Sequence, residues 1–292
     1  MTPARRLIVS GDDFGAAPEV NAGIVRAHCG GILGQTSLMV TGQAAAHAVD
    51  LARAHPRLAV GLHLVLAQGR PAAPPDEVPE LVRADGAFRD TPIRNGLRYA
   101  WAYVRAAGRA QLVREIEAQL QAFAHTGLSL AHVDGHLNMH LHPMVLPILL
   151  ELAPRYGIRA MRISRESLAA ALRWDSRHAL RKCFEGVVFH ALARYAAPRL
   201  AAAGIVSSDR VFGMHQTGHV DERYLLHVIA TLPPGLSEVY AHPATGQAAV
   251  MAGFQEGYDH VGEVAGLTSG RVRAALDAAG VSLTTYRDFA AG

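Results

Sequence analysis

A histidine-rich run in the middle of the chain most constrains what this sequence can fold into. Residues 132–143 read HVDGHLNMHLHP, so four imidazoles and one carboxylate fall within eleven residues. In an extended strand alternate side chains share a face, which puts His132, Asp134 and His136 on one side. A strand cannot bury such a face in an apolar core unless the polar groups have partners. The run therefore predicts a metal site or a catalytic site.

The spacing within the run favours a strand that ends at His136 over a helix. His136 and His140 lie four residues apart, as the two histidines of a helical zinc site do. That motif needs a glutamate directly after the first histidine, but Leu137 stands there, and Pro143 is unfavourable within a helix. We therefore expect His136 at a strand end and His140 in the loop beyond it.

Short apolar runs of strand length alternate along the chain with longer runs of helical periodicity. Repeated βα units predict a parallel sheet, and seven or eight strands in a single domain, residues 1–292, favour an α/β fold of the (β/α) barrel type. The expected strands are residues 6–11, 36–41, 58–63, 130–134, 159–163, 210–213, 238–242 and 282–285. The expected helices are residues 18–28, 44–55, 109–124, 144–156, 221–232 and 269–279.

Polar side chains stand where the predicted strands end. In a (β/α) barrel these ends meet on one face, where barrel enzymes place their active sites. Residues that are far apart in the sequence are therefore expected to form one site. They are Asp12 and Asp13 after the first strand, His63 at the end of the third, Asp134 and His136 at the end of the fourth, Arg162 near the end of the fifth and His242 at the end of a late strand.

Composition excludes several classes of protein. Half of the residues are hydrophobic and 18% are charged, which allows a large core. The basic residues behind the formal net charge of +3 are spread along the chain, so we predict no nucleic acid partner. The two cysteines, Cys29 and Cys183, lack the spacing of a disulfide framework or a zinc ribbon. With no secretory signal and no apolar run of membrane length, we expect a cytoplasmic protein.

Two stretches interrupt the alternation of strands and helices. Residues 67–90 are rich in proline and are expected to form a long loop. Residues 167–204 predict a helical insertion that is both basic and apolar, with Phe184, Val188 and Leu192 among its apolar members. Insertions of this kind usually shape access of the substrate. This one either packs its own apolar face on the barrel, or leaves that face for an apolar substrate or a membrane surface.

The adjacent carboxylates of Asp12 and Asp13 repel each other, and a metal ion or a shared proton relieves that repulsion. We expect one of them to be a metal ligand and the other a general base; the alternative is a turn or a helix N-cap, where aspartate is common. His63 is the natural third ligand beside Asp13 and His136, although a histidine that ends an apolar strand also occurs in cores.

One aspartate with two histidines makes a mixed oxygen and nitrogen site with open coordination positions. Such a site polarises an acyl oxygen and activates water, while a second carboxylate takes the proton of the water and an imidazole protonates the leaving nitrogen. His242 is our candidate for that acid, the alternative being a buried strand histidine. For Arg162 three interpretations stay open: it orients a carboxylate, it binds substrate, or it is a surface arginine. We group Asp134 and His140 with it as candidate substrate-binding residues.

Together these residues resemble the YdjC-like carbohydrate deacetylase family, in order and through nearly the whole chain. This sequence departs from the family at Asn138, where a second histidine is frequent, and at Ala241 and Ala244, which replace the usual Cys and Gly around a His-Pro pair. The motifs that carry the resemblance are Gly11-Asp12-Asp13-Phe14-Gly15, Val20-Asn21-Ala22-Gly23-Ile24, Thr36-Ser37-Leu38-Met39-Val40, Gly61-Leu62-His63-Leu64, His132-Val133-Asp134-Gly135-His136 and His242-Pro243.

The resemblance implies a distorted TIM-like barrel related to polysaccharide deacetylases, and a metal-dependent hydrolase that removes an N-acetyl group from an amino sugar. It implies that Asp13, His63 and His136 hold one divalent metal ion, with Asp12 as general base and His242 as general acid. Zinc and magnesium are the first candidates for the ion, and manganese and cobalt also tolerate such ligands. Because members of the family are often dimers, a homodimer is implied as well.

The segments Tyr240-Ala241-His242-Pro243-Ala244-Thr245 and Val211-Phe212-Gly213 are similar to the hopanoid biosynthesis-associated (HpnK-like) branch of the family. This resemblance implies a glycolipid substrate, an N-acetylglucosaminyl hopanoid, which joins a sugar head to a rigid apolar polycycle, and transient contact with the surface of the inner membrane. Three alternatives stay open. They are a deacetylase of soluble chitooligosaccharides, another metal-dependent hydrolase such as a phosphoesterase, and a sugar- or lipid-binding protein whose metal is structural.

Overall fold

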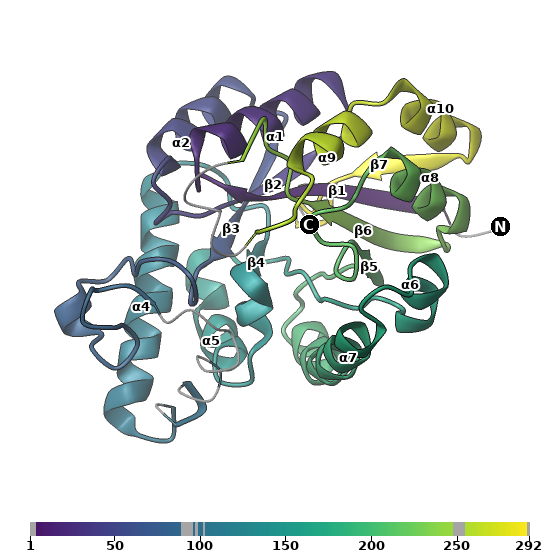
Figure 1. Cartoon of the computed structure of the whole chain (residues 1–292). Helices are drawn as coiled ribbons and strands as arrows, with labels where there is room; N and C mark the ends of the chain where they lie inside the picture. Colours follow the sequence, from purple (N-terminus) through teal and green to yellow (C-terminus); the bar gives the residue numbers. More distant parts are fainter. Residues whose placement is uncertain (1–3, 89–95, 97–98, 102, 248–254, 291–292) are drawn as a thin grey trace.

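A curled parallel sheet forms the centre of the molecule in the computed structural model, which describes residues 4–88, 96, 99–101, 103–247 and 255–290. Its strand order is β4-β3-β2-β1-β6-β5, and β7 pairs with the first half of β1 (Figure 1). Every pair of these strands is parallel. The strands are β1 (Arg5–Phe14), β2 (Gln35–Leu38), β3 (Ala59–Leu64), β4 (Val133–Gly135), β5 (Arg210–Phe212), β6 (Gly235–Ala241) and β7 (Val281–Thr284).

Helices connect the strands, and the first βα unit shows how the sequence directs this pattern. The apolar run of β1, residues 7–9, is buried, as expected for a parallel strand that is covered on both faces. Pro18, whose fixed φ suits a first helical turn, begins α1, and Val20 and Ile24 bury one face of that helix. The helices are α1 (Pro18–Gly30), α2 (Ala45–Ala54), α4 (Ala106–His125), α5 (Leu146–Tyr156), α6 (Leu168–Trp174), α7 (Ala179–Ala202), α8 (Glu222–Thr231), α9 (His260–Leu267), α10 (Gly270–Ala278) and α11 (Arg287–Ala290), with short 3-10 helices η1 (Pro75–Glu77) and η2 (His136–Leu141).

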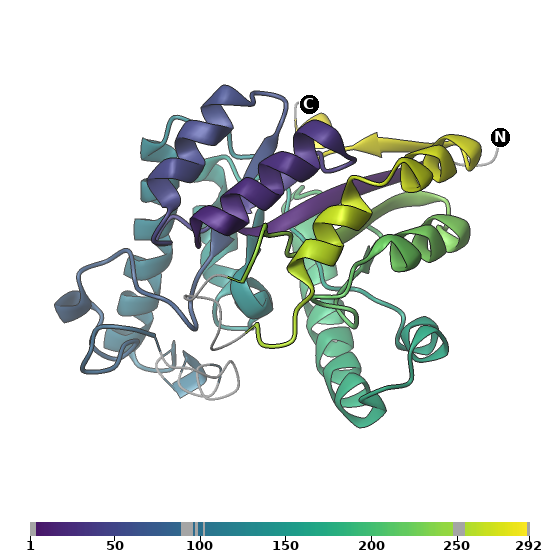
Figure 2. The same ribbon diagram turned by 45° about the horizontal axis from the view of Figure 1, so that its top comes forward.

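The helices lie on both sides of the sheet. Figures 1 and 2 show α2, α1 and α9 side by side in one layer, with α8 and α10 at its far end. The long helices α4 and α5 pack together beside β3 and β4. On the other side lie α6 and α7, where α7 contacts η2, the segment that directly follows β4. The insertion is therefore placed next to the histidine-rich run.

The parallel α/β class is confirmed, but the sheet is not a full TIM barrel. The strand expected at residues 159–163 is reduced to isolated bridges, Val133 with Met161 and Ala160 with Val206. The chain leaves the ladder at Arg162, because its carbonyl oxygen meets Nε2 of His140 at 3.0 Å instead of a strand partner. The curl therefore stays incomplete between β4 and β5.

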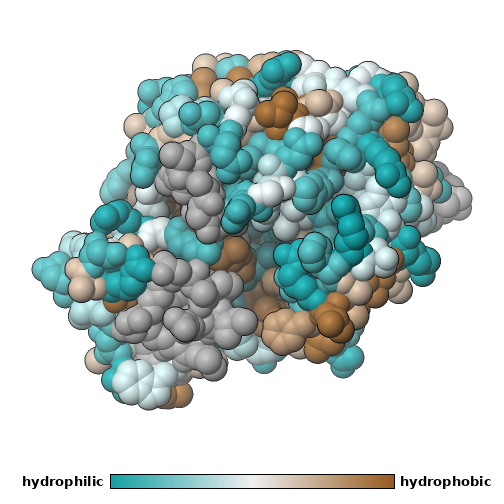
Figure 3. Space-filling model, viewed as in Figure 1, coloured by the Kyte–Doolittle hydropathy of each residue, from teal (hydrophilic) through white to brown (hydrophobic). Residues whose placement is uncertain are grey.

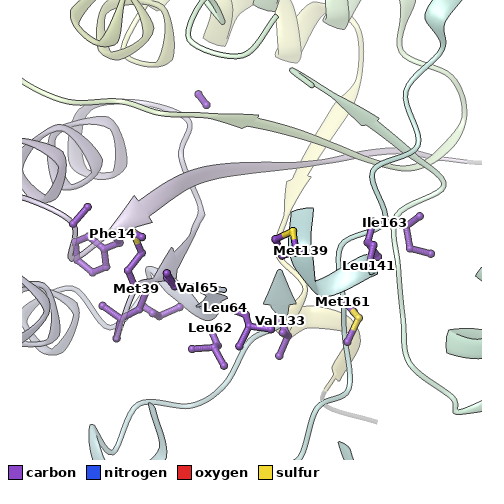
Figure 4. Close-up of a cluster of buried hydrophobic side chains, with 14 of the residues drawn as sticks. Phe14, Met39, Leu62, Leu64, Val65, Val133, Met139, Leu141, Met161 and Ile163 are labelled. Atoms are coloured by element: carbon purple, nitrogen blue, oxygen red, sulfur yellow. The ribbon is translucent and has the colours of Figure 1, made fainter. Parts of the chain in front are cut away.

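A single large hydrophobic cluster supports the strand ends that carry the polar residues. Figure 4 shows part of it, with side chains from β1, β3 and β4 and from the segments that follow β2 and β4. Because these side chains are buried together, the strand ends have little freedom to move. The labelled members are Phe14, Met39, Leu62, Leu64, Val65, Val133, Met139, Leu141, Met161 and Ile163.

The two stretches that interrupt the alternation have the character expected of them. Residues 167–204 contain the helices α6 and α7. Residues 67–88 form a loop whose only regular features are η1 and a bridge between Val82 and Phe88, and the rest of the predicted loop, residues 89–90, lies outside the described residues. Among the described helices, none is both long enough and apolar enough to cross a bilayer.

Candidate metal centre and active site

The aspartate pair lies at the end of β1, where the strand loses its regular geometry. The pairing of β1 with β2 shifts register between Gly11 and Phe14, and Asp13 has a φ of 64°. Aspartate tolerates this left-handed conformation better than most residues. The turn that follows is held by Asn21, whose Oδ1 accepts a hydrogen bond from the backbone N–H of Gly15 at 2.7 Å. The irregular strand end lets the two adjacent carboxylates reach partners in one connected site.

Asp13, His63 and His136 come together as the sequence predicts. Oδ1 of Asp13 lies 3.1 Å from Nε2 of His63 and 3.0 Å from Nδ1 of His136. All three side chains are buried, and one ligand atom from each lies within 4.8 Å of the others. Two imidazoles and one carboxylate are a donor set that suits zinc and related divalent ions.

The charges around this cluster also fit a cation. Burial alone would lower the pKa of His63, yet the charge of Asp134 and the hydrogen bond with Asp13 raise it to about 10. Burial alone would raise the pKa of Asp13, but His136 and then His63 hold it well below its usual range. The cluster therefore stabilises positive charge where its ligand atoms converge, which is what a divalent ion requires.

Short sequence motifs fix the orientation of His63. Its Nδ1 lies 2.8 Å from Oδ1 of Asp134 and 3.0 Å from Oγ of Ser37. Nε2 is thereby left to face Asp13, as in metal sites whose histidine ligands are held through the other ring nitrogen. Gly61, two residues earlier, is required because a Cβ there would fall 2.3 Å from the ring of His132.

Asp12 faces a buried arginine instead of the histidines. Its Oδ2 and Oδ1 accept hydrogen bonds from Nη1 and Nη2 of Arg162 at 2.6 and 2.8 Å. The same guanidinium lies 3.0 Å from Oδ2 of Asp134, and its Nε lies 2.9 Å from Oε1 of Glu238. Asp12, His63 and Asp134 also bring ligand atoms close together, but Arg162 already supplies the positive charge between the two carboxylates. Asp13, His63 and His136 are therefore the better cation site.

Arg162, Asp134 and His140 lie beneath the site. Each is at most 1% exposed, and none of them lines the cavity above the cluster. Burial lowers the pKa of His140 to about 4, so this imidazole is neutral at physiological pH. Of the roles considered for Arg162, the geometry favours orienting a carboxylate. For all three residues it favours a positioning role over the contact with substrate expected from the sequence.

His242 follows the last residue of β6 and borders the same cavity. Its Nε2 lies 4.0 Å from Oδ2 of Asp13. Burial lowers the pKa of His242, against the opposing charges of Asp13 and Asp12. The chain after it is packed directly on α1, because a Cβ on Gly23 would lie only 2.5 Å from Cα of Ala244. This close packing holds the imidazole of His242 at the cavity.

Three residues of the site were not singled out from the sequence. Gln255 donates a hydrogen bond from Nε2 to Oδ2 of Asp13 at 2.6 Å, and the ring of Tyr258 packs edge-on against His242 with centroids 5.3 Å apart. Neither lies in a motif or at a predicted strand end, so no signal in the sequence marks them. Tyr240 stands in the segment 240–245 that was compared with the hopanoid-associated branch, and it lies near the end of β6, two residues before His242, but the sequence assigned no role to it.

A cavity of about 670 Å³ lies over the cluster and has two unlike walls. One wall is polar and contains two of the three candidate ligands together with the candidate catalytic residues. The other is apolar and comes mainly from α7, and Figure 3 shows hydrophobic residues gathered beside a hollow at this position. The polar wall includes Asp12, His63, His136, His242, Gln255 and Tyr258, and the α7 wall includes Phe184, Val188, Phe189 and Leu192.

Comparisons with known proteins identify the family of the chain. The profile of the YdjC-like protein family matches residues 6–278. A carbohydrate deacetylase from Geobacillus stearothermophilus is 32% identical over 287 residues, which cover 98% of each chain. A carbohydrate deacetylase from Brevibacillus brevis is 41% identical over 153 residues, a match that spans 52% of this chain and 57% of that relative. A crystal structure from Enterococcus faecalis V583, of a protein assigned to cellobiose-phosphate cleavage, has a TM-score of 0.75 at 25% identity and is covered to 99%.

Proposed function

Because the chain belongs to the YdjC-like family, we propose that it is a metal-dependent N-deacetylase that acts on the N-acetylglucosamine head group of a lipid. Its family and its curated relatives support an enzyme of the carbohydrate deacetylase kind, which is a hydrolase. One observation carries the assignment of chemistry to residues. The two histidines of a buried Asp-His-His cluster share a cavity with an arginine-bound aspartate and a third, separate histidine.

The chemistry follows from these positions. When bound by Asp13, His63 and His136, a divalent ion would polarise the acetyl oxygen and make water more acidic. Asp12 accepts the proton of the attacking water, and Arg162 fixes the direction of its carboxylate. As the carbon–nitrogen bond breaks, His242 gives its proton to the leaving nitrogen. Its lowered pKa makes the protonated ring a stronger acid for that step. Acetate and a free amine are the products.

The donor set supports zinc over magnesium within the proposed range of metals. Imidazole nitrogen suits zinc, whereas magnesium and manganese are bound mainly by oxygen. The site offers two imidazoles and one carboxylate. Restoring activity to chelated enzyme with each ion in turn tests the choice. Recovery with magnesium alone would overturn it.

The apolar wall of the cavity supports a substrate with an apolar part, and here we propose an N-acetylglucosaminyl hopanoid. A sugar alone needs polar partners, but α7 presents Phe184, Val188 and Leu192 to the space beside the catalytic residues. An apolar polycycle attached to the sugar would cover these side chains and remove them from water. The similarity of residues 240–245 to the hopanoid-associated branch points the same way. A soluble chitooligosaccharide has no apolar part of this size and would leave these side chains exposed to water.

Acetate release by the purified protein tests the proposal. The substrates are an N-acetylglucosaminyl hopanoid and, in parallel, diacetylchitobiose, each with and without chelator. We expect chelator-sensitive release that is far faster from the lipid-linked sugar. Release from chitobiose alone would retain the deacetylase and overturn the lipid substrate. No release from either by protein with bound metal would overturn the deacetylase itself.

Phosphoesterase activity, the other metal-dependent reaction expected of such a site, receives less support. A phosphate substrate favours a second metal or an arginine clamp. Arg162 is committed to Asp12, Asp134 and Glu238 and does not border the cavity. Arg181 does border it, but its Nε lies 3.8 Å from Oε1 of Glu185, another residue of the cavity wall. We propose that the protein works in the cytoplasm. The homodimer implied by the family stays a prediction, which sedimentation of the purified protein checks.

A further inference from the structure

One face of α7 is apolar and exposed. Leu180, Phe184, Val187 and Val188 are 89, 61, 69 and 38% exposed, and we call these four residues the α7 face. Their spacing of four, seven and eight residues from Leu180 places them on one side of the helix. Exposed apolar residues that occur singly are ordinary, whereas a contiguous group marks a surface that meets an apolar partner.

The α7 face is continuous with the cavity. Phe184 and Val188 belong to both, and Phe189 and Leu192 carry the same apolar surface inward to the catalytic side chains. Figure 3 shows hydrophobic residues gathered beside a hollow in the surface, in the region that α7 occupies in Figure 1. An apolar molecule that contacts the α7 face can therefore reach the active site along these four side chains, beside Arg181 and Glu185, which also border the cavity.

Basic residues surround the α7 face. Residues 167–204 contain six lysines and arginines against two acidic residues, a formal net charge of +4, while the whole chain carries +3. Arg177 lies three residues before Leu180, and Arg194 lies seven residues after Val187; both are exposed. A helix with an exposed apolar face and flanking arginines has the composition of a helix that lies in the interface of an anionic membrane.

We propose that the α7 face docks on an anionic lipid bilayer and that the cavity receives its substrate from that surface. The supply of a lipid-linked substrate rests on the proposed function, but the docking does not. A bilayer is the better occupant than a second copy of the chain. A two-fold contact through this face would bring like-charged arginine groups toward each other, whereas anionic head groups attract them.

Sedimentation with vesicles tests the docking. The probes are vesicles of phosphatidylcholine alone and of phosphatidylcholine mixed with phosphatidylglycerol. We expect binding to the anionic vesicles and at least tenfold lower partitioning of the double variant Leu180→Ser, Val187→Ser, which exposes less apolar surface. Neither residue borders the cavity. Val261→Ser, an equally conservative change at an exposed site on α9, is the matched control and should partition as the native protein does.

The charge requirement is tested separately. Arg177→Gln and Arg194→Gln should each lower partitioning on anionic vesicles about fivefold, because an arginine near such a surface contributes about 1 kcal/mol. Equal binding to neutral and anionic vesicles would overturn the role of the arginines. No binding to either kind, or unchanged binding by the double variant, would overturn the docking. A dimer that the double variant dissociates would assign the α7 face to a second copy instead.

The two proposals fail in different ways. If the docking is right, the double variant releases acetate from vesicle-embedded substrate at least tenfold more slowly and from detergent-dispersed substrate at the native rate. Vesicle binding without acetate release in either form would overturn the proposed function and leave the docking intact. Equal release from vesicles by the native and variant proteins would overturn delivery through the α7 face and leave the deacetylase intact.

Discussion

The end of β1 and the inner face of α7 border the same cavity but are built in opposite ways. At the end of β1, buried charged groups are held by several hydrogen bonds each, as Arg162 is held by Asp12, Asp134 and Glu238. On α7 the apolar side chains that border the cavity are at most partly buried, and those of Phe189 and Leu192 are held only by packing against hydrophobic clusters. Catalysis requires that reacting groups be held in fixed orientations. Binding of an apolar molecule requires only apolar surface, because the hydrophobic effect is not directional. The difference teaches that reaction and substrate choice can be altered separately.

Loss of a ligand candidate should have the largest effect. His63→Ala or His136→Ala is expected to remove bound metal and lower acetate release by about a thousandfold or more, because the ion loses one of three protein ligands. Metal content by elemental analysis and acetate release are measured on the same samples. His125→Ala, at an exposed position of α4, is the control and should change neither. Full metal content in both ligand variants would contradict the assignment.

The two aspartates should respond differently to the same change. Asp12→Asn is expected to keep the metal and lose about a hundredfold to ten-thousandfold in turnover, since the base is removed but Arg162 stays in place. Asp13→Asn should lose metal as well. The comparison uses metal content and turnover for both variants. If Asp12→Asn strips the metal and Asp13→Asn retains it, the roles of the two aspartates are reversed.

Gln255 should have an intermediate effect. Gln255→Leu removes the hydrogen bond to Oδ2 of Asp13, and support of this kind around a metal ligand is commonly worth about ten- to a hundredfold in metal affinity. Titration of metal into chelated protein measures the loss, and Gln255→Glu distinguishes the hydrogen bond from the bulk of the side chain. Native affinity in Gln255→Leu would mean that the contact does not hold the ligand.

A substitution in the apolar wall of the cavity should change activity least, and it should affect only the lipid-linked substrate. Val188→Ser is expected to raise KM for a lipid-linked substrate about five- to tenfold, through lost apolar contact, and to leave kinetics on diacetylchitobiose unchanged. Equal effects on both substrates would show that α7 supports the site in general. No effect on either would separate α7 from substrate binding.

The sequence predicts the polar wall better than the apolar one, for a physical reason. Parallel strands bring their carboxyl ends to one edge, so Asp13, His63 and His136 could be brought together from motifs alone. The partners of Arg162 could not, because they depend on how β1, β4 and β6 curl toward each other. Gln255 lies in a segment without periodicity or motif and contacts Asp13 only through the tertiary fold.

The region around α7 marks the other limit of prediction. Composition identified a basic and apolar helical segment, but periodicity could not decide whether its apolar face packs on the sheet or faces the cavity. In the structure Ala193, Ala196 and Leu200 of α7 are buried, whereas the apolar side chains of Phe184 and Val187 are exposed. The incomplete curl between β4 and β5 likewise involves tertiary contacts that no pattern marks, such as that of His140 with the carbonyl oxygen of Arg162.

The arrangement around Arg162 constrains how such a sequence can diverge. One guanidinium contacts carboxylates that arrive from β1, β4 and β6, and it is almost wholly excluded from water. Lysine cannot reproduce a planar group that contacts three acids at once, so even this mild replacement leaves buried charge unmatched. The four positions are therefore epistatic: a change tolerated at one depends on the residues present at the others. Descendants of this chain can accept single substitutions in α7. Substitutions at Arg162 and its three carboxylate partners are tolerated only when several of these positions change together.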